Sequence, residues 1–347
     1  MKPYGEDIPG RVVVFGEVNG AVPSIPLSEY NTRTNRLLLA ALNQQRDKFQ
    51  KLVVDYGPDR VAIILGTSNT GVHEAMAGID EWLESGLRPK TLHFSQIELG
   101  TPASFLAREL GVTGPAYSIS TACSSSAKAF AAARRLIATG VVDAAIVGGG
   151  DGRCRFAFNG FHALSALAAD NCRPLSPSRD GINLGEGAAL FTLERETDVA
   201  ASPDDVFFAG AGETSDAYHA TAPDPEGIGA SAAMRAALAD AHLTAADIGY
   251  LNLHGTGTPA NDMMEAKAVA EIFHLPIVAD DPAATLANCS FKIECTKQFT
   301  GHCLGAAGAV EAALCYLRLA SGEIKGAAMS NSFAFGGSNA SVIFTRR

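Results

Sequence analysis

The chain has 347 residues, of which 47% are hydrophobic and 18% charged, so it can bury a large core in one big domain or two fused ones. The formal net charge of −10 argues against a nucleic-acid surface, and no apolar run is long enough to span a membrane or form a signal core. Seven cysteines at irregular spacing form neither a disulfide framework nor a Cys-x-x-Cys zinc motif, and free thiols suit the cytoplasm.

The first half of the chain alternates predicted strands and helices. Residues 1–30 are broken by proline and glycine, with one strand candidate at 11–15, and a helix is expected over 31–42. Strands are predicted at 60–66, 116–121, 141–150 and 185–194, and helices are expected through Trp82 and from about 102 to 110. Because the strands are continuous apolar runs between helices, we expect a parallel sheet covered on both faces.

The segment 119–140 carries the first candidate functional residue. A strand ends there in a turn of small residues, and the serines at 124–126 favour the start of an Ala-rich helix. Cys123 lies at this junction, where the unpaired N–H groups of the helix would favour an anion and could lower the pKa of the thiol. A buried structural cysteine is the alternative, and position alone does not decide between them.

Two further segments lie between this helix and the second half of the chain. Residues 148–151 (Gly-Gly-Gly-Asp) lack the Lys-Ser/Thr of a P-loop and the Rossmann spacing, so nucleotide binding is not expected. Residues 159–180 are predicted to be rich in loops, and residues 173–180 are expected on the surface near the entrance of the functional site. The Ser-Pro-Asp-Asp segment at 202–205 is the predicted linker.

The second half repeats the strand–helix–strand pattern at 206–211, 228–242 and 250–254. His254 ends the last of these strands and precedes a Gly-Thr-Gly-Thr-Pro turn, and His302 lies in a glycine-rich segment before another Ala-rich helix. Either histidine alone would more often be structural. A cysteine and two histidines, each beyond a strand and beside glycines, are typical of a covalent thiol enzyme.

Four motifs resemble the signatures of the β-ketoacyl-acyl-carrier-protein synthases, the Cys-His-His condensing enzymes of fatty-acid and polyketide assembly. They occur in order at residues 121–126, 254–259, 297–308 and 331–339, within a resemblance that runs from about residue 60 to the C-terminus. The resemblance implies an α/β thiolase-like fold, layered αβαβα, with two similar halves. Residues 1–200 would carry the cysteine and residues 201–347 the histidines.

The resemblance also assigns the chemistry. Cys123 would form an acyl thioester, with an oxyanion hole made by the backbone N–H groups of Cys123 and Phe335. Phe335 would also separate the acyl pocket from the malonyl site, with a core phenylalanine as the alternative. Neutral His254 and His302 would donate N–H to the thioester oxygen when the malonyl group loses carbon dioxide.

Five other residues match supporting positions of the family. Lys297 would orient the catalytic centre and pair with Glu311 on the next helix, because a carboxylate in an Ala-rich helix needs a cation. Thr256 and Thr258 would bind the phosphopantetheine arm, and Asp262 would be a structural helix-start residue. Without the flanking histidines, the threonines would be ordinary turn residues and Lys297 a surface charge.

The substrate would arrive on the phosphopantetheine arm of acyl carrier protein, so neither a metal nor a separate cofactor is expected. The resemblance implies a dimer, either of two copies or with a related subunit. Residues 120–126 and 212–219 resemble synthases of bacterial polyene-type pathways, which implies a specialised, unsaturated acyl chain, with ordinary fatty acids as the alternative. A basic patch for the acidic carrier protein could be formed by five residues: Lys128, Arg134, Arg135, Arg153 and Arg155. Ordinary surface charge is the alternative for each of them.

Three features depart from the family pattern. Its opening strand and helix are largely missing, the link at 319–329 is short, and Ala334 replaces a glycine, which would stiffen the gate. The rival interpretations are a non-catalytic, chain-length-factor-like partner subunit, a biosynthetic thiolase and a scaffolding protein. The nucleophile, both histidines and Lys297 are all present, which favours an active synthase.

Overall fold

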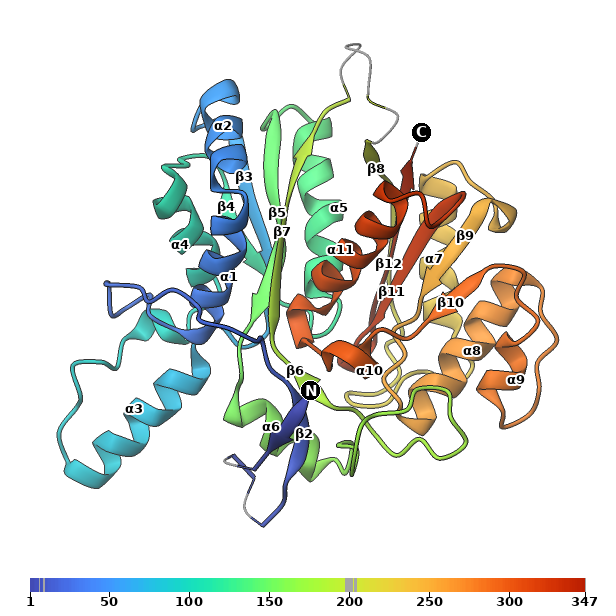
Figure 1. The fold of residues 1–347 in the computed structure, drawn as a ribbon, viewed down its shortest axis with the longest axis horizontal. Coiled ribbons are helices and arrows are strands. Elements are labelled where there is room, and N and C mark those ends of the chain that lie inside the picture. The colour runs from blue at the N-terminus through green and yellow to red at the C-terminus, as the bar shows by residue number, and fades with distance from the viewer. Residues whose placement is uncertain (6, 9, 197–201, 203–204, 347) are drawn as a thin grey trace.

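The computed structural model describes residues 1–346 apart from residues 6, 9, 197–201 and 203–204 (Figure 1). The predicted boundary between residues 200 and 201 and part of the predicted linker at 202–205 therefore lie outside the described residues. Within the described part of the chain, none of the helices is long and apolar enough to cross a lipid bilayer.

Two larger sheets form the framework of the molecule (Figure 1). The N-terminal sheet has the strand order β4 (Ala116–Ile119), β3 (Val61–Gly66), β5 (Ala144–Asp151) and β7 (Gly187–Glu194). The C-terminal sheet has the order β10 (Lys292–Glu294), β9 (Ile248–Asn252), β11 (Ala327–Phe333), β12 (Ser338–Arg346) and β8 (Val206–Ser215). A small third sheet joins β1 (Lys2–Tyr4), β2 (Val13–Gly16) and β6 (Leu184–Gly185).

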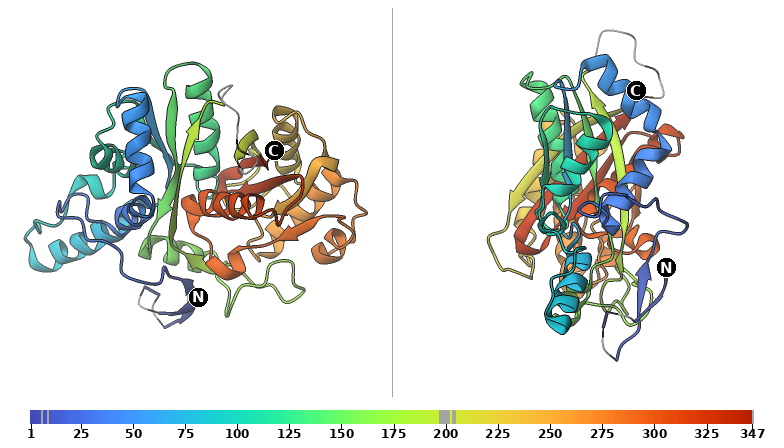
Figure 2. Two further views of the ribbon diagram at one scale, coloured as in Figure 1. Left: turned by 45° about the horizontal axis from the view of Figure 1, so that its top comes forward. Right: turned by 90° about the vertical axis from the view of Figure 1, so that its left-hand side faces the viewer.

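Helices lie between the two larger sheets and on both outer faces, as Figures 1 and 2 show. The middle layer consists of α5 (Ser125–Ala138) and α11 (Ala307–Ala320). The N-terminal sheet is covered outside by α1 (Arg33–Gln44), α2 (Arg46–Tyr56) and α4 (Thr101–Leu110), and the C-terminal sheet by α7 (Ile228–Asp240) and α8 (Pro259–Phe273). The predicted αβαβα layering is confirmed.

The apolar strands are explained by this layering. Successive side chains of a strand point to opposite faces of its sheet. In β3, Ala62 and Ile64 pack into the middle layer with α5 and α11, whereas Ile63 and Leu65 pack against the outer helices. Because both faces of β3 are buried, apolar and polar side chains do not alternate along the strand.

The prediction of parallel strands was wrong in part, because both sheets are mixed. β3 is parallel to β4 and β5, but β7 runs antiparallel to β5, and β12 runs antiparallel to both β11 and β8. A continuous apolar run indicates that both faces of a strand are buried. It carries no information about the direction of the neighbouring strand.

The remaining helices connect these layers. They are α3 (Val72–Ser85), α6 (Arg155–Ala163), α9 (Pro282–Leu286) and α10 (Lys297–Thr300), with short 3-10 turns at Phe94–Gln96, Ala245–Asp247, Leu304–Ala306 and Phe335–Gly337. α6 occupies the beginning of the segment that was predicted to be loops at 159–180.

The glycines at 148–150 lie inside β5, and a Cβ atom on Gly149 would be 2.8 Å from the Ser126 side chain. That glycine allows α5 to pack closely on the sheet.

Candidate active site

A tight turn between β4 and α5 places Cys123. Ala122 adopts a φ of 51°, which is uncommon for a residue with a side chain and reverses the chain immediately before the helix. Ser125 holds the turn, because its hydroxyl accepts a hydrogen bond from the Thr121 N–H and donates to the Ala122 carbonyl. The Cys123 side chain is thus held in the interior at the N-terminus of α5.

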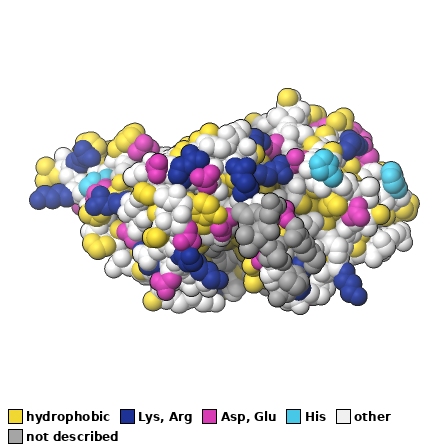
Figure 3. Space-filling model, turned by 90° about the horizontal axis from the view of Figure 1, so that it is seen from above, with side chains coloured by type: hydrophobic (Ala, Val, Ile, Leu, Met, Phe, Trp, Pro, Cys, Tyr) yellow, Lys and Arg dark blue, Asp and Glu magenta, His cyan; other side chains and the backbone are white. Residues whose placement is uncertain are grey.

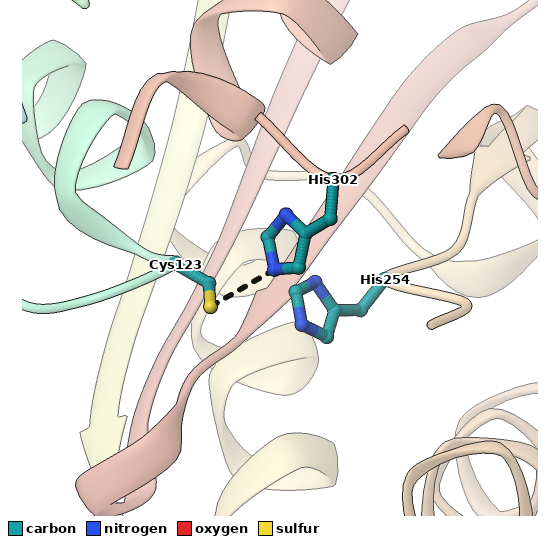
Figure 4. A group of neighbouring side chains, drawn as sticks. All are labelled: Cys123, His254 and His302. Carbon is teal, nitrogen blue, oxygen red and sulfur yellow. Dashed lines mark hydrogen bonds between the residues drawn. The ribbon is translucent and has the colours of Figure 1, made fainter. Parts of the chain in front are cut away.

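The two histidines reach the same point from the other half of the chain (Figure 4). His254 follows β9, and His302 lies between α10 and α11. The Sγ atom of Cys123 lies 3.0 Å from Nε2 of His302, and the ring centroids of His254 and His302 are 5.3 Å apart. One ligand-type atom from each of the three buried residues lies within 4.8 Å of the other two. One small reacting group could therefore contact all three.

The backbone decides which nitrogen of His302 carries the proton. The N–H of Leu304 donates to Nδ1 of His302 at 3.2 Å, so a neutral ring carries its own proton on Nε2. Cys123 therefore faces an N–H donor. The three residue types and their spacing would suit a soft metal ion. To bind a metal through Nε2, however, His302 would have to move its proton to Nδ1, and Nδ1 could then no longer accept the hydrogen bond from Leu304.

Burial controls the protonation of all three groups. It lowers the pKa of both histidines well below 6.5, helped by the positive charge of Lys297, so both rings are neutral at pH 7. Burial also raises the pKa of the Cys123 thiol to about 11, although Lys297 and the backbone N–H groups of Phe335 and Cys123 act in the opposite direction. The backbone N–H groups at the helix terminus thus lower the pKa of the thiol, as the sequence suggested they could, but burial outweighs them. The resting residue is a thiol.

Lys297 and Glu311 form a buried ion pair behind the histidines. Lys297 lies at the start of α10 and Glu311 on α11, and both are 2% exposed. Charges this deeply buried are tolerated only as a pair, because each neutralises the field of the other. The predicted pairing is present, and neither residue lines the catalytic cavity.

A cavity of about 180 Å³ opens in front of the cysteine and the histidines. Its wall includes Thr256 and Thr258, whose Oγ1 atoms are 2.9 Å apart, and Phe335, whose ring centroid is 5.5 Å from that of Phe161. Among the described residues, no lysine or arginine lines it. The structure thus brings six predicted site residues into one cavity: Cys123, His254, Thr256, Thr258, His302 and Phe335.

The comparisons with known proteins agree with this geometry. The model of the β-ketoacyl synthase N-terminal domain matches residues 41–199, and that of the C-terminal domain matches residues 207–329. The chain belongs to the β-ketoacyl synthase family. It is therefore an acyltransferase, as predicted.

Individual relatives extend the likeness along nearly the whole chain. A 3-oxoacyl-[acyl-carrier-protein] synthase 2 of Staphylococcus aureus is 32% identical to this synthase over 378 residues, covering 99% of this chain and 91% of that protein. Nodulation protein E of Rhizobium meliloti is 36% identical over 268 residues, covering 69% and 64%. The prediction that the likeness begins near residue 60 was wrong.

Two solved structures share the fold closely. A chain of the complex between a ketosynthase and its chain length factor from Xenorhabdus doucetiae superposes with a TM-score of 0.89 at 40% identity, covering 100% of this synthase and 90% of that chain. A chain of the ishigamide ketosynthase/chain length factor gives a TM-score of 0.84 at 26% identity, covering 100% and 91%. The predicted thiolase-like fold class is confirmed.

Sequence reasoning missed Glu265 in this synthase. Its carboxylate, on α8, accepts hydrogen bonds from the backbone N–H groups of His254 at 2.7 Å and Gly255 at 2.8 Å. Glu265 is buried, and burial raises its pKa to about 7. The available signal was an acidic residue about one helical turn after Asp262, flanked by the apolar residues Met264 and Ala266. Asp262 itself is structural, as predicted, and accepts from the N–H of Leu175 at 2.7 Å.

The remaining departures of this synthase are local. Ala334 has a φ of −100°, which any residue adopts without strain, so a stiffer gate stays a prediction. The positive φ angles beside Phe335 belong to Gly336 and Gly337. The short link at 319–329 is a simple turn between the end of α11 and the start of β11.

The proposed basic patch is divided by ion pairs. Arg134 pairs with Asp240, Arg135 with Glu213 at 2.8 Å, and Arg155 with Asp80 at 2.6 Å. The other two candidates are also engaged, since Lys128 lies in the field of Glu213 and Arg153 stacks over the ring of Tyr4. On the face in Figure 3, lysine and arginine side chains are likewise interspersed with acidic ones. These observations favour the surface-charge alternative for the five residues.

Proposed function

We propose that this synthase catalyses decarboxylative Claisen condensation between an acyl group carried on Cys123 and a malonyl thioester. The observation that carries the proposal is the 3.0 Å approach of His302 Nε2 to Cys123 Sγ, with His254 beside them in one cavity. A nucleophile and two neutral N–H donors around one point are what acyl transfer and enolate stabilisation require.

In the first half-reaction, the sulfur of Cys123 attacks the carbonyl carbon of an acyl thioester. The backbone N–H groups of Cys123 and Phe335 stabilise the oxyanion that forms. The tetrahedral intermediate then expels the carrier thiolate, which takes up the proton that the Cys123 thiol has lost. The acyl group stays on the enzyme as a thioester.

In the second half-reaction, the malonyl thioester loses carbon dioxide and becomes an enolate. Neutral His254 and His302 donate N–H to its oxygen, and this role is supported by the lowered pKa of both rings and by the tautomer of His302. The enolate carbon attacks the acyl-Cys123 carbonyl and expels the cysteine as a thiolate, which takes up a proton from water and restores the resting thiol. The product is a 3-oxoacyl thioester with two more carbons.

Supporting residues hold the substrate and the catalytic groups in place. Thr256 and Thr258 bind the phosphopantetheine arm, and the Lys297–Glu311 pair fixes the electrostatic environment of the histidines. The arm belongs to the substrate, so we propose a reaction with neither a metal nor a separate cofactor. The polyene-type pathway stays a prediction.

We also propose two protein partners. Acyl carrier protein delivers both thioesters, as the name of the Staphylococcus aureus relative suggests. The second partner is another chain of the same fold, because both similar complexes pair a ketosynthase with a chain length factor. We assign the dimer interface to β4, because this strand lies at the edge of its sheet and its Tyr117 side chain is exposed.

The test uses acyl carrier protein loaded first with an acyl and then with a malonyl group. We expect mass spectrometry to show the acyl mass on the Cys123 peptide, followed by a 3-oxoacyl product and carbon dioxide. Cys123→Ala should abolish acyl transfer and keep a cooperative thermal unfolding transition. Elongation by Cys123→Ala would refute the nucleophile. If product forms only when a second synthase is added, and still forms with the Cys123→Ala variant, the result would support the chain-length-factor-like alternative.

A further inference from the structure

A polar network joins the ends of the parallel strands β3 and β5 to the turn that follows His302. Asp151 is the last residue of β5 and is fully buried, and the turn after β3 begins at Thr67. The Asp151 carboxylate accepts hydrogen bonds from the backbone N–H groups of Ser68 at 3.0 Å and Asn69 at 2.8 Å. It also accepts from the hydroxyl groups of Thr67 at 2.8 Å and Ser68 at 3.0 Å. The carboxylate therefore fixes this turn and the direction of the Ser68 hydroxyl.

Ser68 connects this network to the other half of the chain. Its Oγ accepts a hydrogen bond from the Gly305 N–H at 2.8 Å, while the same hydroxyl group donates its proton to Asp151. Gly305 packs directly on the turn after β3, because a Cβ atom on it would lie 2.7 Å from the backbone nitrogen of Ser68. Any side chain at residue 305 would push the two segments apart.

The turn at 303–305 needs such a hold. Leu304 has a φ of 52°, a left-handed conformation that is unfavourable for a residue with a side chain. In this conformation the Leu304 N–H donates to Nδ1 of His302 at 3.2 Å. Leu304 and Gly305 share a planar peptide group, so the hydrogen bond from Gly305 to Ser68 helps to hold Leu304 in place. Without this bond the turn is free to relax and to turn the Leu304 N–H away from Nδ1.

We propose that Ser68 is a positioning residue that keeps the proton of His302 on Nε2. It acts through the backbone of Gly305 and Leu304, and the Asp151 carboxylate orients its hydroxyl. Neither Ser68 nor Asp151 lines the catalytic cavity, so the effect is exerted on the ring and not on the substrate. This inference rests on the proposed function, in which the Nε2 proton stabilises the enolate, and it concerns a residue outside the four sequence motifs.

The tautomer of His302 tests the inference without turnover. In protein with isotope-labelled histidine, heteronuclear NMR distinguishes protonated from unprotonated ring nitrogens, and His302→Ala assigns the signals. We expect the wild type to carry the proton on Nε2 and Ser68→Ala to move part of the population to the Nδ1 tautomer. Ser68→Thr keeps the hydroxyl group and should retain the wild-type tautomer. Asp151→Asn weakens the hold on Ser68 and should move the population in the same direction as Ser68→Ala.

Kinetic measurements give the matching functional comparison. Ser68→Ala should lower kcat for malonyl decarboxylation roughly three- to tenfold, as for the loss of one neutral hydrogen bond, with KM unchanged. Thr285→Val is the matched control, because the buried Thr285 hydroxyl also accepts a hydrogen bond from a backbone N–H, that of Val278 at 2.9 Å. Thr285 lies on α9, at the outer side of the C-terminal half (Figure 1), so its variant should change neither kcat nor the tautomer.

Unchanged His302 signals in Ser68→Ala would overturn the inference, and so would a defect that lies mainly in KM. A loss of thermal stability in Ser68→Ala with normal kcat and tautomer, as expected of Thr285→Val, would show a purely structural serine. If the wild type condenses no thioester although Ser68→Ala moves the tautomer, the proposed function fails and the positioning role of Ser68 stands. A moved tautomer with normal decarboxylation would likewise refute the donor role of His302 and not the hold that Ser68 exerts.

Discussion

The Leu304 N–H donates to Nδ1 of His302 at 3.2 Å, so the opposite nitrogen presents N–H to the Cys123 sulfur 3.0 Å away. This arrangement suits an electrophilic role for His302 and leaves it without a lone pair for accepting the thiol proton. The direction of one backbone N–H thus selects the chemistry of the catalytic ring.

His302→Ala should reduce malonyl decarboxylation by about 10²-fold or more, because it removes one N–H donor to the enolate oxygen. Release of carbon dioxide from a malonyl thioester, with acyl transfer measured in parallel, checks this. His274→Asn, at the exposed end of α8, is the control and should behave as the wild type. Near-normal decarboxylation by His302→Ala would rule out the donor role.

Alkylation of Cys123 by iodoacetamide should accelerate about tenfold per pH unit between pH 7 and pH 9, with no plateau. The reactive species is the thiolate, and burial raises the pKa of this thiol to about 11, so the ionised fraction grows throughout this range. Mass spectrometry of the Cys123 peptide in a Cys289→Ser background measures the rate. A plateau below pH 8 would mean that the thiol ionises more easily than its burial implies.

Lys297→Met should destabilise the protein by about 3–5 kcal/mol, because it leaves the Glu311 carboxylate buried without its cation. Lys297→Met combined with Glu311→Leu should recover most of this stability and none of the lost activity. Urea denaturation gives the free energies of unfolding. In the exposed pair Lys51–Asp55, Lys51→Met should change stability by less than about 1 kcal/mol. Equal effects at both sites would contradict this account.

Glu265→Gln should destabilise the protein less at pH 8 than at pH 5. Burial raises the pKa of Glu265 from 4.5 to about 7, so its protonated form is favoured in the folded state. Its contribution to stability is present below pH 4.5 and is lost as the pH rises through 7. Over that range the wild type loses about 3 kcal/mol relative to the variant.

Unfolding in urea at several pH values measures this difference between wild type and Glu265→Gln. Glu84→Gln, on the exposed end of α3, is the matched control and should show no comparable pH dependence. If the difference between Glu265→Gln and wild type were independent of pH, Glu265 would titrate as an ordinary carboxylate.

Local patterns in the sequence predicted most of the elements and singled out Cys123 and the two histidines, whereas the αβαβα layer order and the supporting site residues were implied by the resemblance to the family. Turns of small residues mark the positions of Cys123, His254 and His302, and apolar runs mark strands buried on both faces. These properties depend on neighbours along the chain, namely backbone preferences and burial, so they can be read before any long-range contact is known.

Only the tertiary structure decided the direction of β7 and β12, the high pKa of the Cys123 thiol, the tautomer of His302 and the contact of Glu265 with the His254 backbone. Each depends on groups far apart in sequence or on the degree of burial in the assembled core. Hydrogen bonds and desolvation act over a few ångströms of space, whatever the separation along the chain.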